Sequence, residues 1–404
     1  MSVNLNWKTI AVVLGGVVAA LLVVFLMWFY RPWAPYSPAG VWEGRNAEDR
    51  TQFYRSMSDV FPHREMAAST EFRRLPRDIR PLEIAYTHDG EARTVEDYAR
   101  DHDITGLMVV KDGAVVFEEY WRGETADDLH TSWSVAKSVI SLMIGMGIKD
   151  GVIDSIDDPA EKYAPVYQGT DYGSTSIRHL LMMSSGIDFI EDYEAIGSDM
   201  RKLFFNVFFL NQDVDKFVRT YKREKEAGTE FNYQSPNTIV LSAVVRGAYD
   251  RQLSDLAEEK LFAPLGLGNG TWLLDRNARD AKELGYCCIN IRLEDYAKIG
   301  LFAMHDGIVN GEAFLPEGWM TLVTTPPQPS HEPASDHFGY GLHFWVPFQD
   351  SAIFGFHGYN GQVMWVDPSR EVLVVMTGAD RNYPIGNTEF PAMLSAALDA
   401  GAGL

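Results

Sequence analysis

Residues 131–138 of this 404-residue chain read TSWSVAKS and lead into the apolar run VISLMIGMG at 139–147. Apolar side chains occupy nearly every face of the helix predicted from Ser134 to about residue 147, so this helix should lie buried in the middle of the fold. Ser134 and Lys137 are three residues apart, which places a hydroxyl and an amine on one helical face. If Ser134 opens the helix, its unpaired backbone N–H can help hold an oxyanion. The pattern is typical of a serine nucleophile that gives its proton to a lysine, although this spacing arises about once by chance in such a chain.

Strand signals lie on both sides of this helix. Residues 104–120 form two β-rich runs about a Gly-containing turn at 111–113, which predicts a hairpin. A second strand pair is predicted within GQVMWVDPSREVLVVMTG at 361–378, followed by a helix over 391–400. The intervening sequence contains several helical stretches broken by Gly and Pro. These patterns predict an α+β domain, an antiparallel sheet flanked by helices, with a helical second lobe at about 150–330.

The N-terminal region contains a candidate membrane anchor. Residues 9–30, TIAVVLGGVVAALLVVFLMWFY, carry no charge, and a helix of this length spans roughly 33 Å, enough to cross a bilayer core. The run ends in aromatic residues typical of an interfacial belt, whereas a cleavable signal peptide has a shorter apolar region that ends in small residues. We therefore expect an uncleaved single-pass anchor, with a cleaved signal peptide as the alternative. Lys8 precedes the run and acidic residues follow Arg31, so the positive-inside rule mildly favours an extracytoplasmic or periplasmic catalytic domain.

The chain is expected to divide into four parts. Residues 1–8 form a short tail, 9–30 the anchor, and 31–80 a linker and lead-in, because this stretch mixes Pro, Gly, aromatic and charged residues without a clear period. Residues 81–404 form the catalytic domain. A chain of this length with 46% hydrophobic residues can bury a full core, and two lobes are favoured over two independent domains.

Composition argues against several classes of function. A net charge of -21 disfavours a nucleic-acid partner, since affinity for phosphate backbones comes mainly from Lys and Arg. The ten histidines never occur at His-x-His or His-x-x-x-His spacing, which counts against a zinc-dependent β-lactamase or protease. No cofactor is expected. No Gly-x-Ser-x-Gly elbow is present, which counts against an α/β-hydrolase. Cys287 and Cys288 are adjacent and can scarcely reach relaxed disulfide geometry, so we expect small buried hydrophobes and no disulfide.

The segment around Ser134 strongly resembles the nucleophile motif of the class C β-lactamase-like hydrolases, which have the penicillin-recognising fold. The branch that it most resembles is that of the 6-aminohexanoate-dimer hydrolases. Further segments match the same family in the same order, and together they cover most of residues 100–380: 151–154, 157–159, 177–186, 264–266 and 340–341. The resemblance implies a β-lactamase/transpeptidase-like fold and acyl transfer through a Ser134 acyl-enzyme.

The second motif of this family is Tyr-x-Asn or Tyr-x-Ser, and FNYQSPN at 231–237 resembles the Ser form. The resemblance assigns Tyr233 a catalytic role beside Lys137, and it places Ser235 among the substrate-binding residues. A lysine ammonium nearby would favour the phenolate of Tyr233, which could act as base toward Ser134 and as acid toward the leaving group. Considered alone, a tyrosine in such a stretch is more often part of the core.

The third motif, Lys-Thr-Gly or His-x-Gly in the family, differs in this chain, where residues 356–362 read FHGYNGQ. His357 is followed directly by Gly358, and an alternative alignment puts Asn360 in the place of the histidine of a His-Gly-Gln sequence. Both alignments predict a strand edge beside the nucleophile that supplies a second oxyanion donor near His357 and Gly358, and the choice between His357 and Asn360 stays open. Tyr193 resembles a substrate-contacting tyrosine of the amide-hydrolase branch, with a surface-loop aromatic as the alternative.

These features together predict a serine hydrolase that cleaves an amide or ester bond in a small molecule or short peptide. The alternatives are a β-lactamase, a D,D-peptidase, or a catalytically weak, membrane-tethered module that binds cell-wall peptide. Linear amides or simple esters are favoured over β-lactams, because the lysine of the third motif that would pair with the β-lactam carboxylate is missing. The sequence leaves the oligomeric state open.

Overall fold

A seven-stranded antiparallel sheet forms the centre of the protein in the computed structural model, which describes residues 6–34, 36–46, 50–334, 337–349, 351–381 and 388–404. The spatial order is β11-β12-β13-β14-β15-β4-β5. The strands are β4 (Ile104–Lys111), β5 (Ala114–Tyr120), β11 (Gly339–Tyr340), β12 (Trp345–Val346), β13 (Phe354–Gly358), β14 (Gln362–Asp367) and β15 (Val372–Gly378). Both predicted strand pairs are confirmed, and β15 pairs with β4 to join them. Residues 1–5 of the expected tail lie outside the described residues.

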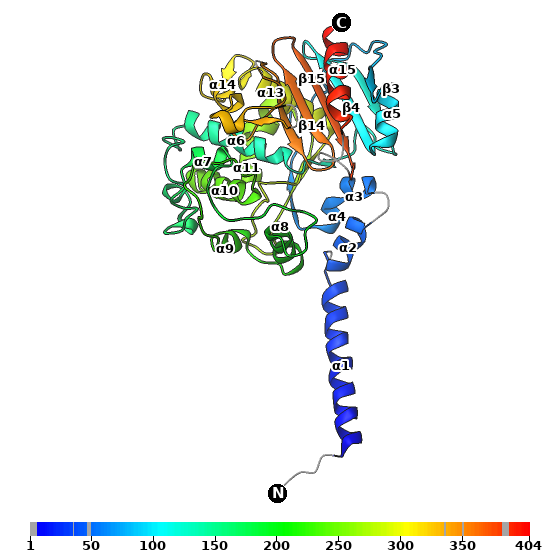
Figure 1. The fold of residues 1–404 in the computed structure, drawn as a ribbon, viewed down its shortest axis with the longest axis vertical. Coiled ribbons are helices and arrows are strands. Elements are labelled where there is room, and N and C mark those ends of the chain that lie inside the picture. Colours follow the sequence, from blue (N-terminus) through cyan, green and yellow to red (C-terminus); the bar gives the residue numbers. More distant parts are fainter. Residues whose placement is uncertain (1–5, 35, 47–49, 335–336, 350, 382–387) are drawn as a thin grey trace.

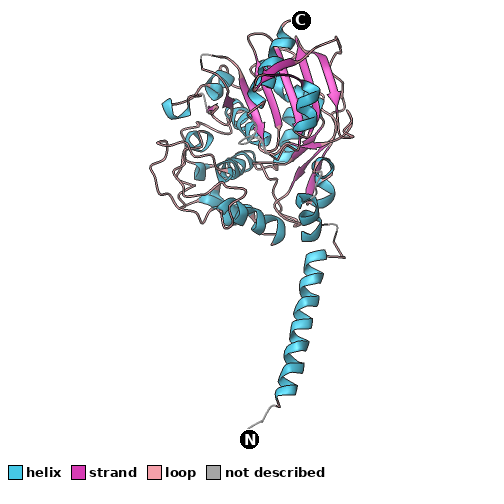
Figure 2. Ribbon diagram, turned by 45° about the vertical axis from the view of Figure 1, so that its right-hand side comes forward, coloured by secondary structure: helices cyan, strands magenta, loops and turns pink. Residues whose placement is uncertain are grey.

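Helices cover both faces of this sheet (Figures 1 and 2). On one face lie α6 (Val135–Lys149) and α13 (Leu293–Met304), and on the other α5 (Val95–Asp101) and α15 (Phe390–Ala402). Alternation along β15 puts Leu373 in the larger apolar core and Val374 in the smaller one. The predicted α+β fold, with an antiparallel sheet between helices, is therefore confirmed.

The second lobe is mainly helical. Its elements are α7 (Ile177–Leu181), α8 (Asp199–Phe204), the π-helical η3 (Phe205–Phe209), α9 (Val214–Val218), α10 (Ser235–Tyr249), α11 (Leu253–Ala257), the π-helical η4 (Glu258–Phe262), α12 (Ala263–Leu265) and α14 (Trp319–Thr324), with short 3-10 turns at Ala160–Lys162, Pro165–Tyr167 and Pro329–His331. A small sheet of order β1-β7-β8-β6 links it to the rest, from β1 (His63–Met66), β6 (His130–Thr131), β7 (Gly270–Leu273) and β8 (Ile289–Ile291). Two hairpins complete the fold: β2 (Ala85–His88) with β3 (Glu91–Thr94), and β9 (Ile308–Val309) with β10 (Glu312–Ala313).

The stretch predicted as a linker, residues 31–80, contains ordered elements. It forms α2 (Pro38–Asn46), α3 (Thr51–Arg55) and α4 (Met57–Val60), followed by β1. Its apolar side chains enter the larger core: Val41, Tyr54, Met57, Phe61 and Met66. We correct the prediction accordingly, because short helices with only a few apolar residues each show no period in the sequence and are stabilised by packing on the domain.

The apolar N-terminal run forms α1 (Trp7–Tyr30), a 24-residue helix with no buried residue. It begins two residues before the predicted start and projects away from the folded domain (Figure 1). Arg31 ends it with a left-handed backbone, φ 41°. The helix is long and apolar enough to be a candidate membrane span.

Candidate active site

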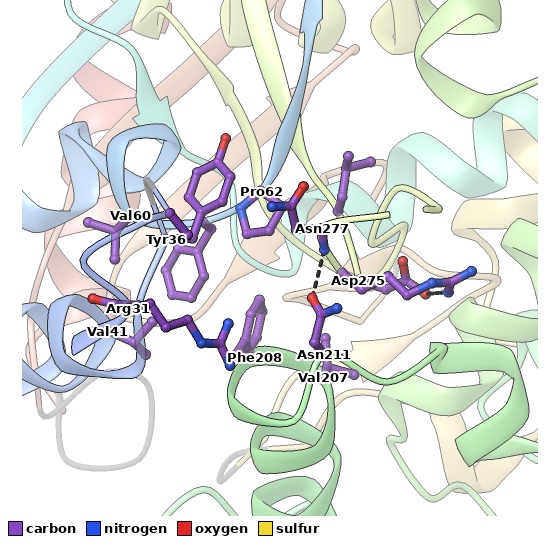
Figure 3. A pocket seen from close by; sticks show the side chains of 15 residues that line it. Arg31, Tyr36, Val41, Val60, Pro62, Val207, Phe208, Asn211, Asp275 and Asn277 are labelled. Atoms are coloured by element: carbon purple, nitrogen blue, oxygen red, sulfur yellow. Dashed lines mark hydrogen bonds and ion pairs between the residues drawn. The ribbon is translucent and has the colours of Figure 1, made fainter. Parts of the chain in front are cut away.

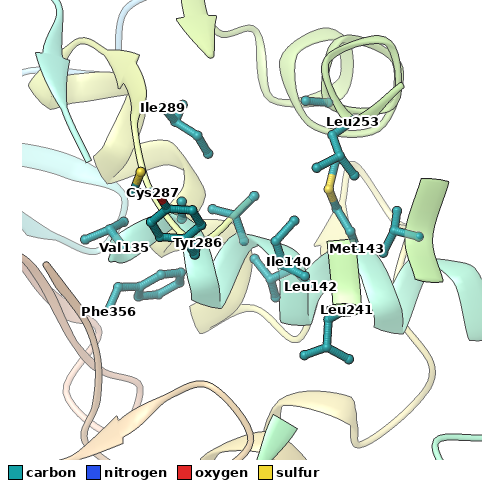
Figure 4. Packing of buried hydrophobic residues seen from close by; sticks show 14 of the residues in the cluster. Val135, Ile140, Leu142, Met143, Leu241, Leu253, Tyr286, Cys287, Ile289 and Phe356 are labelled. Carbon is teal, nitrogen blue, oxygen red and sulfur yellow. The ribbon is translucent and has the colours of Figure 1, made fainter. Parts of the chain in front are cut away.

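Ser134 lies at the N-terminal end of α6, as the sequence predicts. Trp133, directly before it, has φ 43°, a left-handed conformation that bulky residues rarely adopt. Ser132 holds this turn, because its N–H donates to Ile289 O at 2.7 Å and its Oγ accepts from Ile289 N at 3.0 Å. Buried side chains of α6 fix the helix against its neighbours (Figure 4). The candidate nucleophile therefore lies at the start of a buried helix.

Lys137 lies one turn along the same helix, with its Nζ 2.9 Å from Ser134 Oγ. The Nζ also donates to the backbone oxygen of Tyr286 at 3.1 Å, and the residue is only 2% exposed. Burial lowers the pKa of Lys137 to about 8, although the carboxylate of Glu191 acts in the opposite direction. Part of the population is therefore neutral near physiological pH, and a neutral amine at this distance can accept the proton of Ser134.

Tyr233 completes the group around the nucleophile. Its hydroxyl is hydrogen-bonded to Ser134, and its ring centroid lies 5.0 Å from Lys137 Nζ. Burial raises the pKa of the Tyr233 phenol far above its usual value, and the negative charge of Glu191 adds to this effect. The expectation of a phenolate favoured by the lysine is thus wrong, because burial penalises the charged form of both groups. These two shifts favour Lys137 as a proton acceptor and Tyr233 as a proton donor.

Replacing Tyr233 by phenylalanine is expected to lower kcat by roughly 10²-fold or more, since the variant lacks the acid that protonates the leaving group. Thermal melting should change little, because the ring and its packing remain. Steady-state kinetics of Tyr233→Phe would measure the loss.

The matched control for Tyr233→Phe is Tyr286→Phe. The Tyr286 ring lies 5.6 Å from Lys137 Nζ, but its hydroxyl has no hydrogen-bond partner among the described residues. Tyr286→Phe should keep nearly full activity. An equal loss in the two variants would contradict a proton-transfer role for Tyr233.

Glu191 is a site residue that the sequence analysis missed. Its Oε1 accepts from Ser235 Oγ at 2.6 Å, and its Oε2 accepts from Ser235 N at 2.9 Å. Tyr193 OH also donates to Glu191 Oε1, at 2.8 Å. The sequence offered one indication of its role, since Glu191 lies two residues before the predicted site residue Tyr193. The carboxylate of Glu191 therefore links two segments, the loop that contains Tyr193 and the start of α10. Its charge acts on both Lys137 and Tyr233.

Removing the charge of Glu191 should shift the pH profile. The carboxylate raises the pKa of Lys137, so Glu191→Gln should lower that pKa and move the acid limb of kcat/KM to lower pH. The exposed Glu194, in the same loop, provides a matched control, and Glu194→Gln should leave the limb in place. If the acid limb of kcat/KM lies at the same pH in Glu191→Gln as in the unmodified protein, the charge of Glu191 does not influence the pKa of Lys137.

Aromatic rings pack together beside the Ser134 turn. Tyr193 stacks on Tyr359 with ring centroids 4.9 Å apart, and the edge of Tyr359 meets Trp133 at 6.1 Å. Tyr359 was not predicted as a site residue. It follows β13 directly, so the predicted strand edge does lie beside the nucleophile turn. A Cβ atom added to Gly358 would lie 2.5 Å from Ser132 O, which shows how closely the strand approaches.

The side chains of His357 and Asn360 pack into the buried interior. His357 faces the smaller core, with its ring 5.6 Å from Trp345 and 5.3 Å from Trp365, and burial lowers its pKa to about 3. Asn360 is fully buried, accepts from Tyr54 OH at 3.2 Å, and donates to Asp380 O. Alternation along β13 explains the placement of His357, because Phe356 takes the face toward α6. The part of the third motif that lies beside the Ser134 turn is therefore the backbone around Gly358.

Cys287 and Cys288 form a disulfide, with an S–S distance of 2.11 Å. The prediction that adjacent cysteines would remain unbonded is wrong, because the backbone adopts a left-handed conformation at Cys288, φ 72°, and brings the two sulfurs together. Both residues are buried, as expected. Cys287 directly follows Tyr286 (Figure 4). The backbone oxygen of Tyr286 accepts a hydrogen bond from Lys137 Nζ. Within the described ranges, no group of three or more His, Cys, Asp or Glu side chains could hold a metal ion.

Comparison with known proteins identifies relatives of this chain. The chain is 26% identical over 313 residues to the 6-aminohexanoate-dimer hydrolase of Paenarthrobacter ureafaciens, covering 73% of this chain and 78% of that protein. Its fold matches a Bacillus anthracis protein provisionally named 6-aminohexanoate-dimer hydrolase, with a TM-score of 0.76 and 19% identity over 88% of this chain and 94% of the other. It also matches a penicillin-binding protein of Bacillus halodurans, with a TM-score of 0.56 and 18% identity over 70% and 95% of the two chains. The family model for beta-lactamase matches residues 92–398, and this chain accordingly belongs to the beta-lactamase family of serine hydrolases.

Proposed function

We propose that this protein is a membrane-anchored hydrolase that cleaves linear amide or ester bonds through a Ser134 acyl-enzyme. The 2.9 Å contact between Lys137 Nζ and Ser134 Oγ carries the proposal. In the first step Lys137 accepts the hydroxyl proton while Ser134 Oγ attacks the carbonyl carbon. Tyr233 then donates a proton to the leaving amine or alcohol as the C–N or C–O bond breaks. Water releases the acyl group in the second half of the cycle, with the same residues acting in reverse.

Backbone N–H groups are proposed to hold the oxyanion. One is that of Ser134, at the start of α6, where the first helical N–H groups have no intrahelical partner. The other comes from the end of β13 around Gly358, which lies against the Ser132 backbone. Ser235, Tyr193 and Tyr359 are proposed to contact the substrate.

The fold also supports the anchor, because α1 lies wholly outside the packed domain. Its orientation, with the catalytic domain extracytoplasmic, is part of the proposal.

The residues at the position of the third motif favour linear amides and esters over β-lactams as substrates. A β-lactam carries a carboxylate beside its ring, and a cationic side chain there supplies a charge-assisted hydrogen bond. In this chain β13 provides Phe356, which packs in the core, and His357, whose low pKa keeps it neutral. The similarity to the 6-aminohexanoate-dimer hydrolase of Paenarthrobacter ureafaciens points the same way.

A comparison of three substrates tests this proposal. We expect kcat/KM to be higher for a linear ω-amino-acid dimer or a short-chain p-nitrophenyl ester than for a chromogenic cephalosporin. A cephalosporin preference of several orders of magnitude would favour a β-lactamase instead. If no substrate is turned over and a fluorophosphonate probe fails to label the folded protein, a peptide-binding module becomes the better explanation.

A further inference from the structure

The end of α1 is attached directly to the catalytic domain. Arg31, which ends the helix, donates through its guanidinium to Trp28 O at 3.3 Å and to Phe209 O at 2.9 Å. Phe209 is the last residue of η3, in the helical lobe. The α1 helix therefore has a fixed attachment point on the lobe, and η3 lies at the level of its Arg31 end.

Apolar packing reinforces this attachment. A small cavity separates the end of α1 from the domain, and its lining includes Tyr36 and Val41 from the N-terminal segment and Phe208 from η3 (Figure 3). The ring of Phe208 lies 4.6 Å from that of Phe61. A tilt of the domain away from α1 would expose these side chains to water, so the arrangement should persist in solution.

Exposed apolar side chains surround the same point. Trp33 is 65% exposed, Trp42 58%, Phe205 48% and Leu210 42%. We call these four residues the basal patch. The α2 helix, which carries Trp42, contacts η3, and the Phe205 ring stacks on Phe209 at 5.5 Å. Large exposed apolar groups of this kind commonly mark an interaction surface.

The position of the basal patch identifies its partner. The α1 helix has 24 residues and a length of about 36 Å, slightly more than the roughly 30 Å hydrocarbon core, so its Arg31 end reaches the headgroup layer. The exposed Arg201 on α8 lies four residues before Phe205, and a basic group beside aromatic ones suits an interface with anionic lipid. The neighbouring Lys202 is paired with Asp199 at 2.8 Å. A surface fixed at this level lies against the bilayer.

We infer that the basal patch inserts into the interfacial layer of the same membrane that α1 crosses, so that the catalytic domain rests on the bilayer. The partner is the lipid surface itself. This inference depends on the proposed anchor and goes beyond it, because a single helix could equally hold a domain that stands free in water. Docking would also affect the loop that carries Glu191 and Tyr193, because this loop is joined to α8. Ile190 N, just before Glu191, donates to Asp199 Oδ2 at the start of α8 at 3.0 Å.

Fluorescence quenching in the full chain tests the inference. Phe205→Cys and Leu210→Cys each add one free thiol, because Cys287 and Cys288 are buried and disulfide-bonded. Each added thiol carries an environment-sensitive fluorophore, and the protein is reconstituted into phosphatidylcholine–phosphatidylglycerol vesicles. A nitroxide near the headgroup end of the lipid acyl chain should quench about half of their emission. Leu322→Cys, on α14 at the far side of the domain, provides the matched control, since Leu322 is 40% exposed, and it should be unaffected (Figure 1).

Leu21→Cys, in the middle of α1, separates the docking surface from the anchor. If the label at 21 is quenched by a nitroxide deep in the acyl chain while those at 205 and 210 behave like that at 322, docking is refuted and the anchor stands. If the label at 21 is not quenched, the anchor fails and docking fails with it. Quenching at 21, 205 and 210 with none at 322 supports both.

Discussion

Replacing Ser134 by alanine is expected to lower kcat/KM by about 10⁴-fold or more, because no acyl-enzyme can form without the Oγ atom. The fold should remain, since Ser134 precedes α6 and its side chain makes no capping hydrogen bond. Kinetics with the best of the three substrates would measure the loss, and labelling with a fluorophosphonate should disappear in parallel.

Ser138→Ala is the control for this result. Ser138 lies on the same helix, buried, and its Oγ donates to His343 O at 2.5 Å. Its loss should cost about 1–3 kcal/mol of stability and leave labelling intact. If Ser134→Ala kept most of its activity or still bound the probe, the nucleophile would have to be another residue.

Replacing Lys137 by alanine is expected to cause a loss of similar size, because the proton of Ser134 then has no acceptor at 2.9 Å. Residues that act as one unit are not additive, so the Ser134→Ala/Lys137→Ala double variant should be little worse than either single one. Lys149→Ala, at the exposed end of the same helix, should keep full activity. Additive losses in the double variant would indicate independent roles.

The pH profile gives a second measure of Lys137. The neutral amine is the active form, so kcat/KM should rise with pH through about 8, the pKa of Lys137 in the folded protein. Stability should follow the same direction. The folded pKa lies below the unfolded value of 10.5, so the unfolded chain binds more protons in this window and the free energy of unfolding rises between about pH 8 and 10.5. A flat profile through pH 8 would contradict Lys137 as the base.

The sequence by itself determined those parts of the molecule whose information is local. Ser134 and Lys137 could be paired because three residues on a helix bring two side chains to one face. The strand pairs β4–β5 and β14–β15 followed from turns between β-rich runs, and α1 from its composition. Tyr233 and Ser235 required the family resemblance, because nothing in their own neighbourhood distinguishes a catalytic tyrosine from a core one.

The tertiary structure decided what depends on contacts between distant segments. Three contacts join loops that no periodicity in the sequence connects. They are the hydrogen bond from Ser235 to Glu191, the one from Lys137 to the Tyr286 oxygen, and the stacking of Tyr359 on Tyr193. The roles within the proton-handling pair also depend on burial, which lowers the pKa of Lys137 and raises that of Tyr233. Burial is a property of the packed chain. The sequence therefore predicts the candidate nucleophile and its base, whereas the direction of proton transfer and the proposed membrane-facing surface could be inferred only from the packed structure.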